Sequence, residues 1–474
     1  MKAQAPLHPA LIAELRAIVG PQGLLLDPVD RWAYGFDNSR RQAMPQGVIL
    51  VDAAAQVALL VSICHRESLP LIARGRGTGT TGATVPDQGG LVLSFERMNR
   101  ILSLDAANRL AIVEPGVTNQ ALQEAAAQQG FFWPPDPTSA ATCTLGGNLA
   151  CNAAGPRAVK YGTPRENTLG LSAVTGVGEP LCTGVKTTKG VVGYDLTRLI
   201  IGSEGTLALI TQATLKLSPL PEAKATLRAS YTDIHAAAAA VSAIMAQAVI
   251  PCALEFMDAS AIAMARHVAD LGLPAGTGAL LMIEVDGTIQ GIDEAATRVA
   301  QAAQQAGLLE IRTAASRAEV SALWRTRTAL SPALRRIAPK KINEDVVVPV
   351  ARLGAFIEGV EGLGQEHQIR IVNFGHAGNG NIHVNLLVNP DDLDEMARAE
   401  RCLDAIFRLV LELEGTLSGE HGVGLAKRDF VHLELDPVAL RLMHAIKRQF
   451  DPRGILNPGK TLPPLPKDGG QNGI

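Results

Sequence analysis

Residues 74–82 read Arg-Gly-Arg-Gly-Thr-Gly-Thr-Thr-Gly, directly after a short apolar segment with the character of a β-strand. Gly77, Gly79 and Gly82 have the spacing G-x-G-x-x-G, which in a dinucleotide-binding βαβ unit opens a helix that meets the pyrophosphate. Residues 83–90 contain a proline and two glycines and are a poor helix, so we reject a nicotinamide-binding turn. The loop still offers backbone N–H groups beside two arginines, which suits a diphosphate; an ordinary glycine turn is the alternative.

Two further clusters of small residues follow, in residues 144–155 and in residues 202–207, the second just before a predicted strand. Such residues allow backbone to approach a flat ligand and to donate hydrogen bonds to it. Any one cluster alone is more often a turn. Together with the loop at residues 74–82, they indicate one extended nucleotide cofactor.

The composition is that of an ordinary globular protein, with 474 residues, 47% hydrophobic and 19% charged, which predicts two or three domains. A net charge of −3 and a pI near 6.4 provide no general attraction for nucleic acid or anionic lipid, so we expect a small-molecule partner. The six cysteines lack a C-x-x-C pair, which argues against an iron–sulfur cluster and against a disulfide scaffold. Reduced thiols favour the cytoplasm.

Neither of two candidate segments has the character of a targeting or membrane segment. Residues 1–9 lack an apolar signal core, and residues 235–250 are too short and too interrupted by polar residues to span a bilayer. We therefore expect a cytoplasmic protein without a transmembrane segment.

The pattern of the chain changes after residue 219. Residues 48–72 read as a βαβ-like unit. Beyond residue 219, alanine-rich helices such as 236–247 alternate with strands such as 279–285, which predicts an α+β domain with an antiparallel sheet. The expected domains are residues 1–219, 220–420 and 421–474.

Residues 373–385 gather His376 and His383 among asparagines and glycines, in a chain with ten histidines. Alternating apolar residues predict a strand after the glycines, and period-two alternation places His383 and Asn385 on one face of it. The glycine turn can fold His376 back toward that face. Two imidazoles then converge, with a purely structural role for the pair as the alternative.

Residues 418–424 add a carboxylate and a third histidine between glycines, Glu420 and His421. Two histidines and one glutamate form a sound ligand set for Zn²⁺ or another divalent ion, with open positions left for a substrate. An imidazole next to that set is suited to act as a general base near neutral pH.

Three motifs together resemble the FAD-binding domain of the vanillyl-alcohol oxidase superfamily. They are the loop at residues 74–82, Pro135-x-Pro137 followed by Leu145-Gly146-Gly147-Asn148, and residues 202–206. The whole chain resembles the FAD-linked D-2-hydroxy-acid dehydrogenases, which include D-lactate dehydrogenase, D-2-hydroxyglutarate dehydrogenase and the glycolate oxidase flavin subunit. The resemblance implies an α+β fold: an FAD-binding domain of two subdomains, a substrate (cap) domain with an antiparallel sheet, and a C-terminal segment that returns to the flavin domain.

The resemblance also implies FAD, which we expect to be noncovalent because no histidine lies in the first glycine loop. The implied FAD contacts come from the three clusters, from a proline–threonine pair and from the C-terminal segment. They are Arg74, Gly75, Arg76, Gly77, Thr78, Gly79, Gly82, Pro137, Thr138, Thr144, Gly146, Gly147, Asn148, Asn152, Gly155, Gly202, Glu204, Gly205, Ile210 and Asn457.

The implied reaction is the metal-assisted oxidation of a D-2-hydroxy acid, of the D-lactate or D-2-hydroxyglutarate class, to the 2-oxo acid by hydride transfer to flavin N5. By the same resemblance His376, His383 and Glu420 hold a divalent metal, with zinc expected, and His421 is the catalytic base. The alternatives are a glycolate oxidase flavin subunit, a non-redox flavin-dependent synthase, and a non-catalytic flavin- or metal-binding subunit.

The resemblance assigns the substrate carboxylate to Arg327, whose planar fork grips a carboxylate at two points, with Ser331 and Asn385 as further substrate contacts. Asn343 departs from the pattern, because some relatives carry there a lysine that binds a second carboxylate. We expect electrons to leave through a quinone, an electron-transfer flavoprotein or a cytochrome, and a homodimer is possible.

Overall fold

The computed structural model of the chain describes residues 6–266 and 272–465. Within the helix at residues 317–337, the side chains of several residues lie outside this description. Ser331 is one of them, so its predicted contact with the substrate stays a prediction.

The N-terminal part of the chain forms a small mixed sheet with its helices. Its elements are α1 (Pro9–Val19), η1 (Pro21–Gly23), β1 (Leu24–Leu25), α2 (Pro28–Trp32), β2 (Gly47–Leu50), α3 (Ala54–Glu67), β3 (Leu71–Arg74) and β4 (Leu91–Ser94). The strand order is β1-β2-β4-β3, and β2, β4 and β3 run parallel. Val57, Leu60, Val61 and Cys64 recur at helical spacing on α3 and bury one face of that helix in the core of this subdomain.

The second subdomain is built on a five-stranded antiparallel sheet. Its elements are β5 (Ile101–Asp105), β6 (Leu110–Val113), α4 (Asn119–Ala127), β7 (Phe131–Phe132), α5 (Leu145–Cys151), α6 (Ala158–Tyr161), β8 (Thr168–Thr175), β9 (Pro180–Gly184), α7 (Leu196–Ile200), β10 (Ala208–Lys216) and β11 (Ser218–Pro219). The order is β5-β6-β10-β8-β9, and β11 pairs with β7. Trp133 is fully buried in this core, and its indole N–H donates to the Asn167 carbonyl at 3.0 Å.

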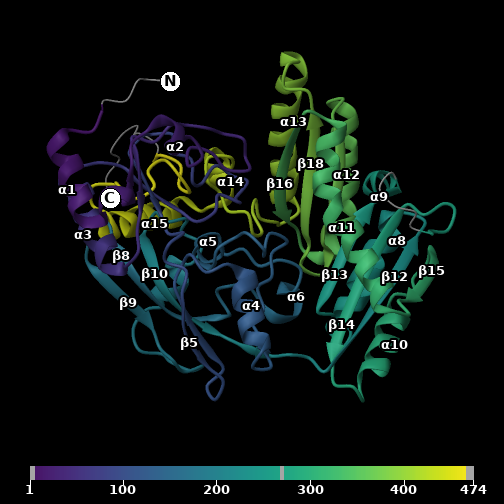
Figure 1. Ribbon diagram of the computed structural model, residues 1–474. Helices are drawn as coiled ribbons and strands as arrows, with labels where there is room; N and C mark the ends of the chain where they lie inside the picture. The colour runs from purple at the N-terminus through teal and green to yellow at the C-terminus, as the bar shows by residue number, and fades with distance from the viewer. Residues whose placement is uncertain (1–5, 267–271, 466–474) are drawn as a thin grey trace, which may run out of the picture.

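The cap domain is a seven-stranded antiparallel sheet in the order β15-β12-β14-β13-β17-β18-β16 (Figure 1). Its elements are β12 (Ala223–Tyr231), α8 (Ile234–Ala246), β13 (Ala253–Asp258), α9 (Ala259–Arg266), β14 (Ala279–Gly287), α10 (Ile292–Ala302), β15 (Leu308–Thr313), α11 (Arg317–Ile337), β16 (Lys340–Val347), η2 (Val350–Arg352), α12 (Leu353–Glu366), β17 (Arg370–His376), η3 (Ala377–Asn379), β18 (Asn381–Val388) and α13 (Leu393–Glu412).

Side chains along strand β18 point alternately to the two faces of this sheet. Ile382, Val384 and Leu386 enter the main core with residues of α8, α12 and α13. Leu387 enters a smaller core with residues of α9 and α11, and His383 lies on that same face. His383 therefore lies on the face of the sheet against which α9 and α11 pack.

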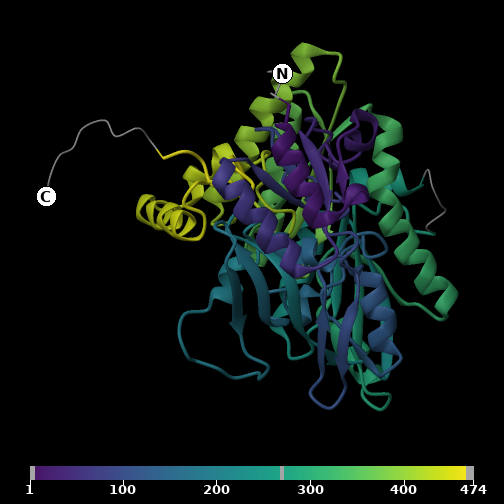
Figure 2. The same cartoon turned by 60° about the vertical axis from the view of Figure 1, so that its left-hand side comes forward.

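The C-terminal segment returns to the first sheet after η4 (Arg428–Phe430), α14 (Val431–Glu434) and α15 (Pro437–Phe450). The Leu71 N–H donates to the Ile455 carbonyl at 2.8 Å, and the Asn457 N–H donates to the Leu71 carbonyl at 2.9 Å. This parallel bridge extends the sheet at the edge of β3. Figures 1 and 2 show the yellow C-terminal helices against the purple N-terminal subdomain, far in sequence but adjacent in space.

The α+β architecture with an antiparallel cap sheet is confirmed. The small-residue cluster at residues 144–155 is not a loop throughout. Part of it forms helix α5, which is capped by Thr144. Thr144 Oγ1 accepts a hydrogen bond from the Gly147 N–H at 3.3 Å, which starts the helix despite its glycines. Among residues 6–266 and 272–465, none of the helices combines the length and the apolar character that a membrane span requires.

Candidate active site

His376 and His383 lie on the two strands of a hairpin, where β17 ends and β18 begins. The turn between them contains Gly380 at φ 70°, and a Cβ atom there would come within 1.9 Å of the Val348 carbonyl oxygen, so the turn requires glycine. The imidazole centroids lie 5.2 Å apart with the rings nearly perpendicular. The turn thus brings the two imidazoles together, as the sequence predicted, and their role as ligands stays a prediction.

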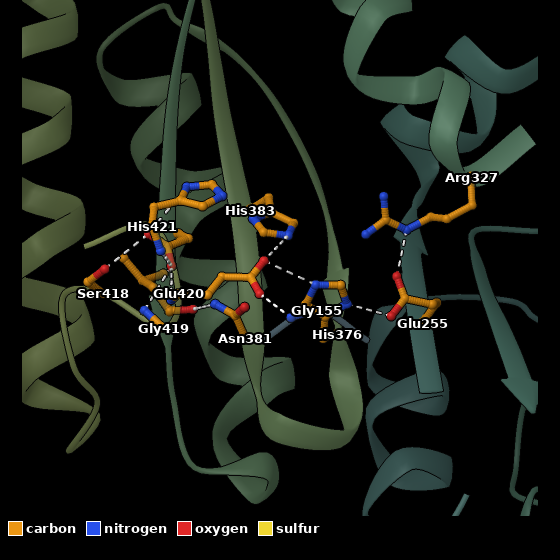
Figure 3. Close-up of polar contacts among 12 residues, drawn as sticks. Gly155, Glu255, Arg327, His376, Asn381, His383, Ser418, Gly419, Glu420 and His421 are labelled. Carbon is orange, nitrogen blue, oxygen red and sulfur yellow. Dashed lines mark hydrogen bonds and ion pairs between the residues drawn. The ribbon is translucent and has the colours of Figure 1, made fainter. Parts of the chain in front are cut away.

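Glu420 reaches the same place from the loop that follows α13. Its Oε1 lies 3.3 Å from His376 Nε2 and 3.7 Å from His383 Nε2, and the ligand atoms of the three residues all lie within 4.8 Å of one another (Figure 3). Its Oε2 accepts a hydrogen bond from the Gly155 N–H at 2.7 Å, which fixes the carboxylate. Two imidazole nitrogens and one carboxylate oxygen this close together fit a divalent ion of the zinc type.

The surroundings shift the pKa of each member of this cluster. Burial lowers the pKa of His376, but the carboxylates of Glu255 and Glu420 more than offset it, and the pKa rises to about 10. Burial, followed by the nearby His421 and His376, holds the pKa of His383 well below its ordinary value. Burial raises the pKa of Glu420, but the neighbouring histidines lower it more, so it lies well below its ordinary value. His383 and Glu420 are therefore in ligating forms at neutral pH, whereas His376 would release a proton on metal binding.

The fully buried carboxylate of Asp345 holds the loop that carries His421. Its Oδ2 accepts hydrogen bonds from the backbone N–H groups of residues 419–421, at 2.8, 2.6 and 3.0 Å. Its Oδ1 accepts one from Lys427 Nζ at 2.6 Å and lies 3.4 Å from His421 Nδ1. Burial raises the pKa of Asp345, but the nearby His421 and Lys427 lower it by more, so the pKa lies below its ordinary value and the carboxylate stays ionised.

The His421 imidazole stacks on His383, with the two ring centroids 5.2 Å apart and the ring planes at 15°. His421 Nδ1 faces the carboxylate of Asp345. Nε2 is then the ring atom suited to accept a proton from a bound molecule. The structure thus places the predicted base beside the predicted metal ligands.

Arg327 comes from α11 and lies on the side of His376 that is opposite to Glu420 (Figure 3). Its Nε donates to Glu255 Oε2 at 2.7 Å, and its guanidinium carbon lies 4.7 Å from the centroid of the Phe374 ring. Glu255 Oε1 in turn lies 2.5 Å from His376 Nδ1. Figure 3 shows the two terminal nitrogens of Arg327 turned toward the histidines. A carboxylate could be gripped there, close to the cluster.

Asn385 has a more internal environment than a substrate contact requires. It is fully buried, and its Nδ2 donates to the carbonyls of Val372 and His383, both at 2.9 Å. Its Oδ1 has no hydrogen-bond partner among the described residues. Asn343 faces it directly across the β16–β18 pair. Its role as a substrate contact stays a prediction.

A cavity that is open to solvent lies between the two subdomains of the first domain. The predicted FAD residues that line it are Arg74, Gly75, Thr144, Gly146, Gly147, Glu204, Gly205 and Ile210. A Cβ atom on Gly75 would come within 2.3 Å of Thr144 Oγ1, so the two clusters approach as closely as glycine permits. This small-residue lining between two sheets fits an extended flat cofactor.

The remaining predicted FAD residues lie outside that lining. They are Arg76, Gly77, Thr78, Gly79, Gly82, Pro137, Thr138, Asn148, Asn152, Gly155, Gly202 and Asn457. The contacts of these residues with FAD stay predictions.

Arg74 lies in the lining, but its guanidinium donates to the carbonyls of Ala33 and Phe36, at 3.2 and 2.8 Å, and so holds the start of the glycine loop in place.

The loop that carries Glu420 and His421 is hydrogen-bonded directly to the first domain, which contains the cavity. Glu204 Oε2 accepts a hydrogen bond from the Gly424 N–H at 2.9 Å, and the Thr81 carbonyl accepts one from the Leu425 N–H at 2.8 Å. Asn457 Nδ2 donates to the Glu204 carbonyl at 2.7 Å. One short segment thus connects the histidine cluster with the flavin-side loops.

Sequence reasoning missed Glu255, Asp345 and Lys427. The only local signal for Glu255 is a carboxylate inside β13, whose six residues are all buried. Such a residue must be paired or hydrogen-bonded, which marks it as functional or structural but not as a neighbour of His376. Lys427 is fully buried beside Asp345, and nothing in its local pattern indicates that burial.

Comparison with protein families identifies both halves of the chain. Residues 45–184 match the family described as FAD binding domain. Residues 220–461 match the family described as FAD linked oxidases, C-terminal domain. The second match contains the histidine cluster, Glu420 and Arg327.

Three curated relatives are similar over most of their length. The chain is 38% identical over 450 residues to the glycolate oxidase subunit GlcD of Bacillus subtilis, covering 95% of this chain and 96% of the relative. It is 32% identical over 464 residues to D-2-hydroxyglutarate dehydrogenase of Stutzerimonas stutzeri, covering 96% and 99%. It is 33% identical over 428 residues to D-lactate dehydrogenase of Anaerostipes hadrus, covering 88% and 90%.

Solved structures share the fold at low sequence identity. p-Cresol methylhydroxylase with substrate bound is 18% identical, with a TM-score of 0.78 and 97% of each chain covered. Alkyldihydroxyacetonephosphate synthase is 20% identical, with a TM-score of 0.76, covering 97% of this chain and 87% of the other. The fold is therefore the vanillyl-alcohol oxidase type.

Proposed function

This chain belongs to the FAD-linked oxidases, as an oxidoreductase of the D-lactate, D-2-hydroxyglutarate and glycolate type, and we propose that it oxidises a D-2-hydroxy acid with the help of a divalent metal. The observation that carries the proposal is the convergence of His376, His383 and Glu420 beside His421, on a loop bonded to the flavin-side residues. When bound, FAD supplies the acceptor for the hydride, and the metal, for which we propose zinc, supplies a Lewis acid.

The side chains of this site divide the work on the substrate. Arg327 grips the carboxylate through its terminal nitrogens, while its Nε stays on Glu255. His421 Nε2 takes the proton of the α-hydroxyl, and Asp345 at Nδ1 stabilises the imidazolium that forms. The proton thus stays on His421 while the hydride leaves the α-carbon, and the product is the 2-oxo acid.

Glycolate is a second candidate substrate, favoured by the likeness to the Bacillus subtilis relative, which is named as a subunit of glycolate oxidase. In that case partner chains would carry the electrons onward; otherwise a quinone, an electron-transfer flavoprotein or a cytochrome would accept them. Asn343 in place of a lysine favours a monocarboxylate over a dicarboxylate.

The proposal is tested by mixing the metal-replete holoprotein anaerobically with D-lactate, D-2-hydroxyglutarate, glycolate and the L-isomers while following the flavin absorbance. We expect bleaching by at least one D-2-hydroxy acid and none by its L-isomer. Bleaching by glycolate alone supports the second candidate. A flavin that no 2-hydroxy acid reduces contradicts the proposal.

Gly75→Ala tests the flavin cavity independently of the reaction. The added methyl group would displace Thr144 Oγ1, which caps α5, and loss of that cap alone costs about 1 kcal/mol. We expect the purified variant to carry less FAD per chain than the wild type, measured from the flavin-to-protein absorbance ratio. Gly362→Ala is the control, because a Cβ atom there meets no atom within 4 Å, and it should retain FAD fully. Full FAD content in Gly75→Ala would contradict the close approach of the two clusters.

A further inference from the structure

Glu255 is the residue that joins the histidine cluster to Arg327. One carboxylate oxygen, Oε1, lies 2.5 Å from His376 Nδ1, and the other, Oε2, accepts a hydrogen bond from Arg327 Nε at 2.7 Å. The side chain is 2% exposed, so both contacts lie away from bulk water. Cross-strand pairing of Glu255 with His376 in the β13–β17 ladder sets the first contact by backbone register.

The contact with His376 fixes one ring nitrogen and leaves the other for a metal. Because a carboxylate oxygen accepts, Nδ1 carries a proton, and Nε2, 3.3 Å from Glu420 Oε1, is the nitrogen that offers its lone pair to a metal once its own proton is released. His383 has no equivalent anchor, since its Nδ1 lacks a hydrogen-bond partner among the described residues. Orientation of the ligand set therefore depends strongly on Glu255.

The contact with Arg327 fixes the other end of the site. Glu255 holds Nε on one edge of the guanidinium, and the Phe374 ring covers its face. The terminal nitrogens are then directed toward the histidines (Figure 3). A fork oriented in this way is ready for a carboxylate without further ordering of the side chain.

We propose that Glu255 is a positioning residue that sets the distance between the metal ligand His376 and the carboxylate clamp Arg327. The α-hydroxyl and the carboxylate of a 2-hydroxy acid are on adjacent carbons, so the groups that receive them must keep a fixed separation. A single rigid carboxylate bonded to both provides that separation. This inference rests on the proposed function for the identity of the two receiving groups.

Glu255→Gln is the informative substitution, because glutamine keeps the size of the side chain but presents an NH₂ group to one of the two donors. We expect a divalent-metal affinity about 10- to 100-fold weaker, measured by chelator competition with Zn²⁺ on the FAD-loaded protein. With saturating metal, we expect a raised KM for the hydroxy acid and a kcat close to that of the wild type. FAD content should not change.

Glu284→Gln is the matched control. Glu284 lies on the neighbouring strand β14 and is buried. Its side chain contacts Lys224 at 2.9 Å, Trp324 at 3.2 Å, Thr226 at 3.5 Å and Cys252 at 3.6 Å, none of them a predicted ligand. The control should lose stability without losing metal affinity or raising KM. A purely structural Glu255 would behave in the same way, so a Glu255→Gln variant with wild-type metal affinity and KM overturns the proposal.

Glu255→Asp provides the test if Glu255→Gln does not fold. It keeps the charge but withdraws it by one methylene, so it must also weaken metal binding, and a wild-type dissociation constant overturns the proposal. The wild-type protein separates the two claims: failure to bind Zn²⁺ at all contradicts the proposed function. Wild-type binding matched by the Glu255→Gln variant, with an unchanged KM, contradicts the role of Glu255 alone.

Discussion

His421→Ala is expected to keep FAD and metal but to lose the reduction of the flavin by substrate. General base catalysis by a positioned side chain contributes about 10²- to 10⁴-fold, and we expect the rate of flavin reduction to fall by that factor. The loop itself should persist, because Asp345 holds it through backbone N–H groups and through Lys427 rather than through the imidazole. Anaerobic stopped-flow absorbance of the flavin measures this rate.

His432→Ala is the control for this variant. His432 lies in α14, in the same part of the chain, and is exposed, so its removal should leave the rate unchanged. Added imidazole should restore part of the lost rate in His421→Ala, since it can occupy the space beside Asp345 and accept the proton. A wild-type rate in His421→Ala would remove this residue from the mechanism.

Local patterns predicted those parts of the site that depend on neighbouring residues. Alternation in β18 sent Val384 and Leu386 to the core and His383 to the other face, as the structure has them. The glycine turn that brings His376 back is equally local, because Gly380 adopts a backbone conformation that other residues rarely accept. The hairpin was therefore predictable from residues 369–388.

Contacts between distant segments were not predictable in this way. Glu255 lies 121 residues from His376, and Asp345 lies 76 residues from His421. The first contact depends on the pairing of β13 with β17, which are not consecutive in the chain, and the second on the bridge between Val347 at the end of β16 and Thr416 in the loop before His421. Hydrophobic periodicity gives the face of each strand but not its partner, so the residues that hold the ligands appeared only in the structure.

The same distinction applies to α5. Its glycines predict a poor helix, and the sequence indicated only a cluster of small residues. The Thr144 cap and close packing stabilise the helix; a Cβ atom on Gly146 would come within 2.6 Å of Pro115 Cβ. Tertiary contacts therefore outweigh the low helix propensity of these glycines, both of which line the cofactor cavity.

His376→Ala is expected to remove bound metal and activity together while FAD is retained. The substitution deletes one of three predicted ligands, so the loss of metal affinity should exceed the roughly 10- to 100-fold expected for residues that only orient a ligand, Glu255 included. Metal per chain by inductively coupled plasma mass spectrometry and flavin reduction by D-2-hydroxy acids should fall in parallel. Chelator treatment of the wild type should reproduce the loss of activity, and added Zn²⁺ should reverse it only in the wild type.

Stability must be measured beside these quantities, because His376→Ala also leaves Glu255 with one partner fewer. An unsatisfied buried acceptor costs about 1–3 kcal/mol, so a lower unfolding temperature is expected even where the fold is intact. His367→Ala, at the end of α12 in the same domain, controls for the loss of a histidine outside the cluster. The ligand assignment is contradicted if the His376→Ala protein is folded, holds FAD and binds wild-type amounts of metal. Any loss of activity in that variant would then come from the lost contact between His376 and Glu255.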